Sequence, residues 1–272
     1  MGRSTKVSGA SVPKQATRQG QTLASYVYGI VPADLEMPPD ERGLGDPAGK
    51  VHMVRHGEIA ALVSDVDVDQ PLGQPGDFMA HERLLDVVAA KGPVLPFRFG
   101  SVVANTDAVV AELLEPHHDE FLEALRDLKG QAEYIVKGRY AELAVMEEIL
   151  AENGEAATLR EVIRGTSEDA TRNERIRLGE IIAASIEAKR AVDTELLCDA
   201  LSGLYAEGVI REPTHELDAV NVAFLVKTSD QEALERALSE FGEQWAGRVE
   251  LRLLGPLAPY DFVTAQADAE GV

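Results

Sequence analysis

The sequence predicts an α+β protein with two domains. Short runs that alternate apolar and polar residues, as half-buried strands do, are interspersed with longer runs of helical spacing. The chain has 272 residues, of which 45% are apolar, and this is enough to build two separate cores. We expect a disordered basic tail at 1–22, an N-terminal α+β domain at 23–129, a C-terminal domain at 130–264 and a flexible tail at 265–272.

The N-terminal domain begins with a β-rich run that Pro32 ends. A segment rich in Pro, Gly and Asp over 32–49 predicts a long loop, and 65–76 predicts a second one. His56-Gly57 is expected to join two short strands as a hairpin. The predicted elements are strands at 24–31, 50–55, 58–64 and 94–99 and helices at about 77–90 and 106–128.

The C-terminal domain starts with a strand that leads into a series of helices. The predicted elements, in order, are a strand at 131–140, helices at about 139–152, 155–164 and 168–206, strands at 207–217 and 219–227, a helix at 230–244 and a strand at 248–254. This order is that of a ferredoxin-like βαββαβ domain in which extra helices follow the first strand.

The segment VLPFRFG, residues 94–100, stands out in the first domain. Alternation along an extended strand would give it two faces, with Leu95, Phe97 and Phe99 on one and Val94, Pro96 and Arg98 on the other. Pro96 lacks a backbone donor and predicts a strand start or an edge position. Arg98 could clamp a carboxylate on a partner, or form a structural ion pair with one of the 47 acidic residues of the chain. An exposed edge here would accept a partner strand.

Residues that usually carry chemistry do not form a recognisable site in this sequence. The run Asp65–Asp69 begins like a calcium loop, but the sixth and twelfth positions, which need Gly and Glu, are Gln70 and Gly76. His81 lies on the apolar stripe of its helix, which predicts a buried, hydrogen-bonded side chain rather than a catalytic one. Cys198, mid-helix, is typical of an apolar filler. We therefore expect no catalytic residue, no cofactor and no metal site.

The charge of the chain restricts its partners. The net charge is −21, and residues 1–22 carry four basic side chains and no acid, which leaves 22 basic against 47 acidic residues elsewhere. Such a body repels phosphate backbones and anionic lipid, so we expect neither nucleic acid nor a membrane as a partner.

A single cysteine excludes an intrachain disulfide, and no apolar stretch approaches the length of a membrane span. These features favour a cytoplasmic protein.

The last apolar run ends in GPLAPYDF, residues 255–262. Pro256 must stop the preceding strand, lie on a sheet edge or form a bulge. This segment resembles the GPxxPYxF ending of the gas vesicle protein F/L family, and LPFRFG resembles the LPxRFG segment of the same family. YVYGIV, ALVSDV and a helix with His81-Glu82-Arg83 occur in the expected order, so the resemblance covers about residues 24–263.

The resemblance implies two α+β domains, the second ferredoxin-like, and a non-enzymatic accessory role in gas vesicle assembly. It implies contact with the small hydrophobic shell protein, and a second class of partner is other vesicle accessory proteins. A rival hypothesis is a small-molecule-binding or enzymatic α+β protein, because ferredoxin-like domains often hold ligands on the sheet face. The candidate motif and interface residues are Pro96, Phe97, Arg98, Phe99, Gly100, Gly255, Pro256, Pro259, Tyr260 and Phe262.

Overall fold

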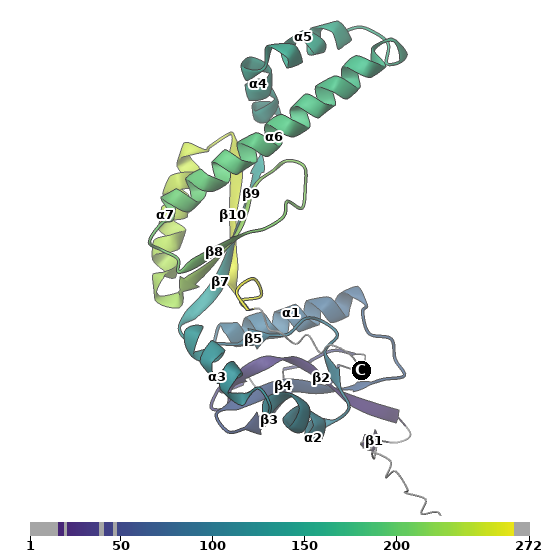
Figure 1. Ribbon diagram of the computed structural model, residues 1–272, viewed down its shortest axis with the longest axis vertical. Coiled ribbons are helices and arrows are strands. Elements are labelled where there is room, and N and C mark those ends of the chain that lie inside the picture. Colours follow the sequence, from purple (N-terminus) through teal and green to yellow (C-terminus); the bar gives the residue numbers. More distant parts are fainter. Residues whose placement is uncertain (1–15, 19–20, 38–40, 46–47, 264–272) are drawn as a thin grey trace, which may run out of the picture. The chain divides into compact units, whose positions relative to one another are not determined.

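The computed structural model describes residues 16–18, 21–37, 41–45 and 48–263, which form two compact units (Figure 1). The first unit runs to Lys129 and the second begins at Gly130. Each unit contains one antiparallel sheet, and seven α-helices are found in the described residues. The protein is therefore a mixed α and β protein, as the sequence predicts.

The two predicted tails lie largely outside the described residues. This holds for 265–272 and for most of 1–22. The N-terminal boundary is wrong in one respect, because β1 (Ala16–Arg18) and the start of β2 (Gln21–Pro32) fall inside the predicted tail. Ala16 pairs with Leu23 across the two strands. Backbone hydrogen bonds, rather than an apolar pattern, define this segment, so composition did not reveal it.

The sheet of the first unit is built around β2. On one side β2 pairs with β4 (Ile59–Asp67), which pairs with β3 (His52–His56). The predicted hairpin is confirmed, since His56 pairs with Ile59 and Gly57 has a positive φ of 58°. The other side of β2 is occupied in turn by three short strands, namely β1, β6 (Val102–Val103) and β5 (Leu95–Pro96).

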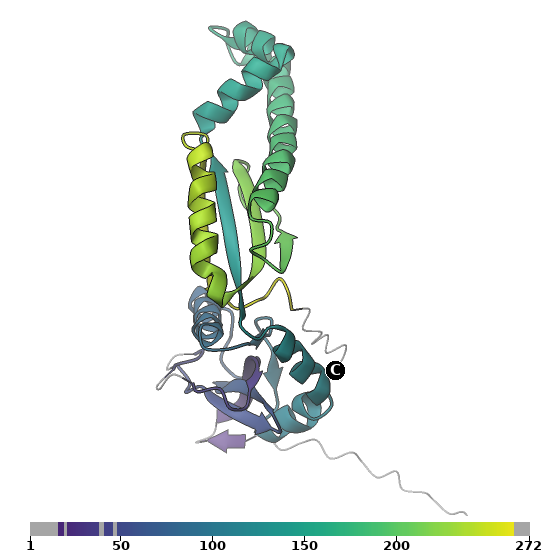
Figure 2. The ribbon, with the colours of Figure 1, turned by 90° about the vertical axis from the view of Figure 1, so that its left-hand side faces the viewer.

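Helices lie on both faces of this sheet (Figure 2). One face carries α1 (Pro75–Ala89). The other carries α2 (Thr106–Ala108), a π-helical turn at Val109–Leu114 and α3 (His118–Asp127). The single helix predicted over 106–128 is therefore wrong. Pro116 has no N–H and cannot continue a helical ladder, and the chain bends there before α3 begins.

The second unit has a four-stranded sheet in the order β10-β7-β9-β8. Its strands are β7 (Gln131–Tyr140), β8 (Glu207–Ile210), β9 (Asp218–Lys227) and β10 (Val249–Leu257). The strand predicted over 207–217 is too long, because residues 211–217 form a loop. Pro213 lacks a backbone donor, which is unfavourable for continued pairing.

Three helices of the second unit pack on one face of this sheet, namely α4 (Glu142–Glu152), α6 (Arg172–Ala200) and α7 (Gln231–Gln244). The remaining helix is α5 (Gly154–Ile163). Side chains of α4, α6 and α7 form one core with alternate residues of β7 and β9, including Tyr134, Val136, Val222 and Phe224. Beyond the sheet, α5 packs against the first part of α6 as a helical extension (Figure 1). Among the described helices, none combines the length and the apolar character that crossing a bilayer requires.

Candidate functional site

The segment 94–100 does not form the predicted strand. Only Leu95 and Pro96 pair with β2, and the N–H of Phe97 then donates to the carbonyl of Tyr28 at 2.8 Å. The chain turns at Gly100, whose φ is +100°. It meets β2 again at Ser101, whose carbonyl accepts the N–H of Val27 at 2.8 Å. Since no described strand pairs with the outer side of β5 or β6, this segment is a broken edge of the sheet.

The predicted faces are also wrong here, because Phe97 packs against α3 on one face of the sheet while Phe99 packs against α1 on the other. Val94, Leu95, Pro96 and Phe97 are all buried. Phe97 reaches Phe121 of α3, with ring centroids 6.2 Å apart, while its carbonyl oxygen contacts His81 of α1. Helices cover both faces of the sheet at this two-residue strand. Its side chains are therefore buried on both sides, and burial does not alternate along the segment.

His81 anchors this segment from α1. Its Nε2 lies 3.0 Å from the carbonyl oxygen of Phe97, which can only accept, so Nε2 carries the proton. Its Nδ1, 2.9 Å from the Tyr26 hydroxyl, is then the acceptor. The same hydroxyl accepts the N–H of Gly100 at 3.1 Å. Burial lowers the pKa of His81, so the neutral ring is favoured. The prediction of a buried, hydrogen-bonded histidine is confirmed.

Arg98 is the exposed member of the motif. No described acidic side chain forms an ion pair with it, so the structural ion pair considered from the sequence is not present in the described part of the chain. Phe99 beside it is half-buried and stacks on Phe78 of α1, with ring centroids 4.0 Å apart. Phe78 is itself 45% exposed. A cation next to an accessible aromatic pair and a broken sheet edge forms one accessible surface, which we call the Arg98 surface (Arg98, Phe99, Phe78).

The second motif lies in the other unit and closes β10. The pairing of β10 with β7 shifts register between Leu254 and Leu257, which is the bulge considered for Pro256, and β10 is an edge strand of its sheet. The Gly255–Pro256 bond is cis. Gly255 has a φ of +143°, and a Cβ atom there would lie 2.6 Å from the Tyr134 ring. Beyond β10, Pro259 is buried, Phe262 is half-buried and Tyr260 is 37% exposed.

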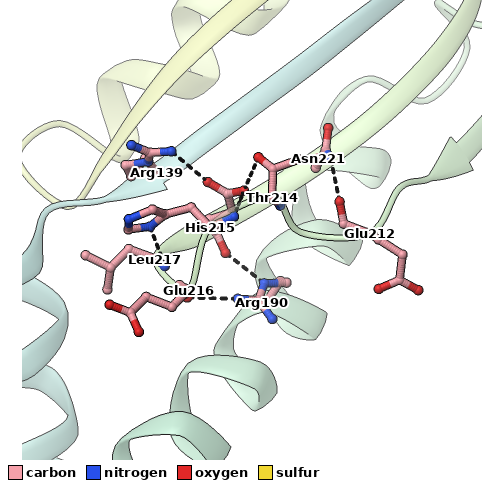
Figure 3. A network of polar contacts seen from close by, with 9 residues as sticks. Arg139, Arg190, Glu212, Thr214, His215, Glu216, Leu217 and Asn221 are labelled. Carbon is pink, nitrogen blue, oxygen red and sulfur yellow. Dashed lines mark hydrogen bonds and ion pairs between the residues drawn. The ribbon is translucent and has the colours of Figure 1, made fainter.

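Two polar networks of the second unit were missed by the sequence reasoning. The first surrounds Asp218, at the start of β9 (Figure 3). Its carboxylate accepts the N–H groups of Thr214 and His215 at 2.7 and 2.8 Å and the Thr214 hydroxyl at 2.9 Å. Arg190 of α6 donates to the Asp218 carbonyl at 2.7 Å. Burial opposes ionisation, but these hydrogen bonds hold the pKa of Asp218 below its usual range.

The first network therefore fixes a loop and does not form a reactive centre. Asn221 adds a hydrogen bond to the carbonyl of Glu212 at 2.8 Å, and Arg139 of β7 lies 3.3 Å from the Asp218 carboxylate. These contacts tie the loop 211–217 to Asp218 and Asn221 of β9 and to Arg190 of α6 (Figure 3). The sequence feature that could have indicated this network is the polar run REPTHELD, residues 211–218, between two strands.

The second network is centred on Arg248, just before β10. Its guanidinium contacts Asp193 of α6 at 2.8 Å and Glu148 of α4 at 2.7 Å. It also lies over the rings of Tyr140 and Trp245, at 5.3 and 5.8 Å from their centroids. Asp193 in turn accepts the Tyr140 hydroxyl. This network links two helices to the sheet, and the distances in sequence are too large for spacing rules to predict it.

These arrangements do not assemble a catalytic centre. In the part of the chain that the structure describes, no three His, Cys, Asp or Glu side chains gather as metal ligands would. Cys198 is half-buried, and burial raises the pKa of its thiol, which disfavours the nucleophilic thiolate.

Comparison with known proteins gives consistent results. The family model described as gas vesicle synthesis protein GvpL/GvpF matches residues 24–264. Gas vesicle protein F of Streptomyces sp. (strain CB03234) is 36% identical over 245 residues, which are 89% of this chain and 100% of that protein. Gas vesicle protein F of Dolichospermum flosaquae is 24% identical over 91% of this chain and 100% of that protein. The crystal structure of GvpF from Anabaena sp. PCC7120 has a similar fold, with a TM-score of 0.69 and 23% identity over 87% of this chain and 96% of that one.

Proposed function

The chain belongs to the GvpL/GvpF family of gas vesicle synthesis proteins, and from this premise we propose that it is a non-enzymatic accessory protein of gas vesicle assembly that binds the small hydrophobic shell subunit. The observation that carries the proposal is the match of the family model to residues 24–264. The protein would act in the cytoplasm and at the gas vesicle. Other vesicle accessory proteins are further candidate partners.

Physical chemistry supports this role. A wall that keeps water out of a gas space needs very apolar subunits, and such subunits aggregate before they assemble. A partner with a net charge of −21 stays soluble and can keep a bound apolar subunit in solution. Shielding the subunit or nucleating its assembly requires no reactive residue.

The Arg98 surface is our first candidate for the contact. It combines an accessible cation, the stacked rings of Phe78 and Phe99 and a broken sheet edge. Aromatic and arginine side chains dominate the binding energy of many interfaces. Pro96 and Gly100 would keep the backbone in this shape, since Pro96 lacks an N–H and Gly100 has a φ of +100°. The other motif, with Gly255, Pro256, Pro259, Tyr260 and Phe262, would have a structural role at the end of β10.

Co-expression with the shell subunit, followed by affinity capture of this chain, tests the proposal. We expect the subunit to be captured by the wild type and R98E to capture at least several-fold less. R236E, which makes the same charge change at an exposed position of α7, should capture as much as the wild type. Absence of the subunit from every captured fraction would contradict shell binding, and equal loss in both variants would contradict the Arg98 surface.

We further propose that the two units are separate domains, divided between Lys129 and Gly130, and that the second is ferredoxin-like. The strand order β10-β7-β9-β8 supports this, because it is the order fourth, first, third, second within the unit, with helices after the first and third strands. The helices α4 and α5 and the first part of α6 would be the insertion.

Small-molecule binding is the alternative function. A pocket of about 780 Å³ lies between α6 and the loop 211–217. Its lining includes Met146, Ile182, Ile186, Arg190 and His215. A ligand that binds there should raise the thermal stability of the protein. A melting temperature that stays unchanged across a metabolite library would argue against this alternative.

A further inference from the structure

The segment that follows β10 returns to the sheet of the second unit. Residues 258–263, here called the C-terminal strap, form a tight turn in which the N–H groups of Phe262 and Val263 donate to the carbonyl of Pro259 at 3.2 and 3.1 Å. Ala258 is fully buried. The strap contacts β7 through the N–H of Asp261, which donates to Oε2 of Glu133 at 3.0 Å.

Glu133 is an unusual residue for its position. It lies between Ala132 and Tyr134, whose side chains belong to the core under the helices, so its own side chain is on the opposite face of the sheet. It is nevertheless only 2% exposed. Its neighbours across the two adjacent strands are Leu225 and Leu257, so both strands present apolar side chains to it.

Two charged groups face Glu133. One is the Asp261 carboxyl group on the strap, and the other is Arg211, just after β8, whose Nε lies 3.5 Å from Oδ2 of Asp261. That Oδ2 atom is buried and has no hydrogen-bond partner among the described residues. One arginine with a long contact to Asp261 does not also neutralise the buried carboxylate of Glu133.

The pKa of Glu133 is raised from its usual 4.5 to about 8. Burial is the main cause, and the nearby Asp261 carboxyl group raises the pKa further. Hydrogen bonding to the Asp261 N–H and the charge of Arg211 act in the opposite direction. At neutral pH the closed strap therefore keeps a proton on the Glu133 carboxyl group.

We propose that Glu133 and Asp261 form a proton-operated latch that holds the C-terminal strap on the helix-free face of the sheet. When the strap is closed, the Glu133 carboxyl group keeps its proton. When the strap lifts, water reaches Glu133, the proton leaves to solvent and the carboxylate is hydrated. Lifting also exposes the buried Ala258 and Pro259, so the latch regulates access to this face. The proposal does not depend on binding of the shell subunit.

The sign of the pH dependence follows from linkage. An open strap gives Glu133 its usual pKa near 4.5, and a closed one gives about 8. The stabilisation of the closed strap is therefore complete below about pH 4.5 and is lost as the pH rises to about 8. Between these values the opening equilibrium constant rises up to about tenfold per pH unit, and above them it levels off.

Hydrogen–deuterium exchange of the full chain tests this inference. The protection factor of peptides covering 257–263, corrected for the intrinsic exchange rate, is measured from about pH 6 to about pH 9. For the wild type we expect a fall of up to about tenfold per pH unit, ending near pH 8. In E133Q, whose side chain can still accept the Asp261 N–H but cannot ionise, the protection factor should not change with pH. E250Q is the control, because Glu250 is exposed on the neighbouring strand β10, and it should keep the wild-type slope.

Two results would overturn the latch: a wild-type protection factor that is constant across this range, or an E133Q slope equal to that of the wild type. If circular dichroism shows that E133Q does not fold, D261N takes its place. Asp261 lies after the last strand, so folding of the sheet does not require its charge. Removing that charge should lower the pH at which the fall in protection ends, and an unchanged end point would refute the pairing of the two carboxyl groups.

Discussion

His81 shows how one side chain can hold an irregular segment in place. Its two ring nitrogens connect α1 to Tyr26 on β2 and to the carbonyl of Phe97. The neutral tautomer with the proton on Nε2, which burial favours, makes both bonds. Since Tyr26 also accepts the N–H of Gly100, the conformation of residues 97–100 depends on a single buried histidine.

The charge state of His81 gives a prediction on pH. Burial lowers its pKa in the folded state, so its contribution to stability is present above the usual value near 6.5 and is lost as the pH falls through the lower folded value. We expect the unfolding free energy of the wild type to fall more between about pH 7.5 and about pH 5.5 than that of H81Q, which cannot be protonated. Urea titrations at both pH values measure this difference. Equal losses would show that His81 does not control the response.

Gly255 gives a second prediction at this scale. In G255A the new Cβ would lie 2.6 Å from the Tyr134 ring, at a φ of +143° that side chains rarely adopt. We expect a loss of about 2–4 kcal/mol in unfolding free energy, measured by urea titration, from strain and overpacking together. The control is G203A, because Gly203 has a positive φ of 86° but open space around it. It should cost about 1 kcal/mol from backbone strain alone. Equal costs would show that the contact with Tyr134 is unimportant.

The elements that the sequence predicts well are those with a regular period. β7, β9, α7 and the hairpin of β3 and β4 fall close to the expected ranges, because their alternation or helical spacing is uninterrupted. The segments 94–99 and 106–128 fail for a common reason. In each segment a proline interrupts the regular pattern, and tertiary contacts determine the backbone conformation. Contacts with His81 and Phe121 do so in 94–99, and the π-helical turn interrupts 106–128.

The candidate site could be predicted only in part. Its motifs were visible, but the exposure of Arg98 between buried residues follows from the turn at Gly100 and not from alternation. The pair of Glu133 and Asp261 joins residues 128 positions apart, so no local pattern reports it.

Arg248 leads to a prediction about the arrangement of elements. It joins α4, α6 and the sheet through Glu148, Asp193 and Tyr140. R248M leaves the buried Asp193 without its cation, and we expect a loss of about 3–5 kcal/mol in unfolding free energy. R252M breaks an ion pair with Glu250 in which both side chains are 72% exposed, and it should leave the unfolding free energy nearly unchanged. Urea titration of both variants measures the difference. A similar small effect for both would mean that helix packing does not need this network.

At the scale of the whole molecule, the two units differ in how they are built. The first surrounds a broken sheet with helices on both faces, and the second places its helices on one face of its sheet and the C-terminal strap on the other. Each unit has its own buried core in the described residues. The excess of acidic residues in both favours solubility over self-association.

Separate cores predict that the second unit folds alone. The core cluster of residues 132–253 includes side chains of β7, β9, β10, α4, α6 and α7 and no residue before Gly130. We expect a fragment of residues 130–264 to unfold cooperatively in urea, with a single transition seen alike by Trp245 fluorescence and by circular dichroism. The change R248M, introduced into the fragment, should lower its unfolding free energy by the same amount as in the full chain, since all its partners are present. A fragment without a cooperative transition, or a different cost of the substitution, would mean that the stability of the second unit depends on the first.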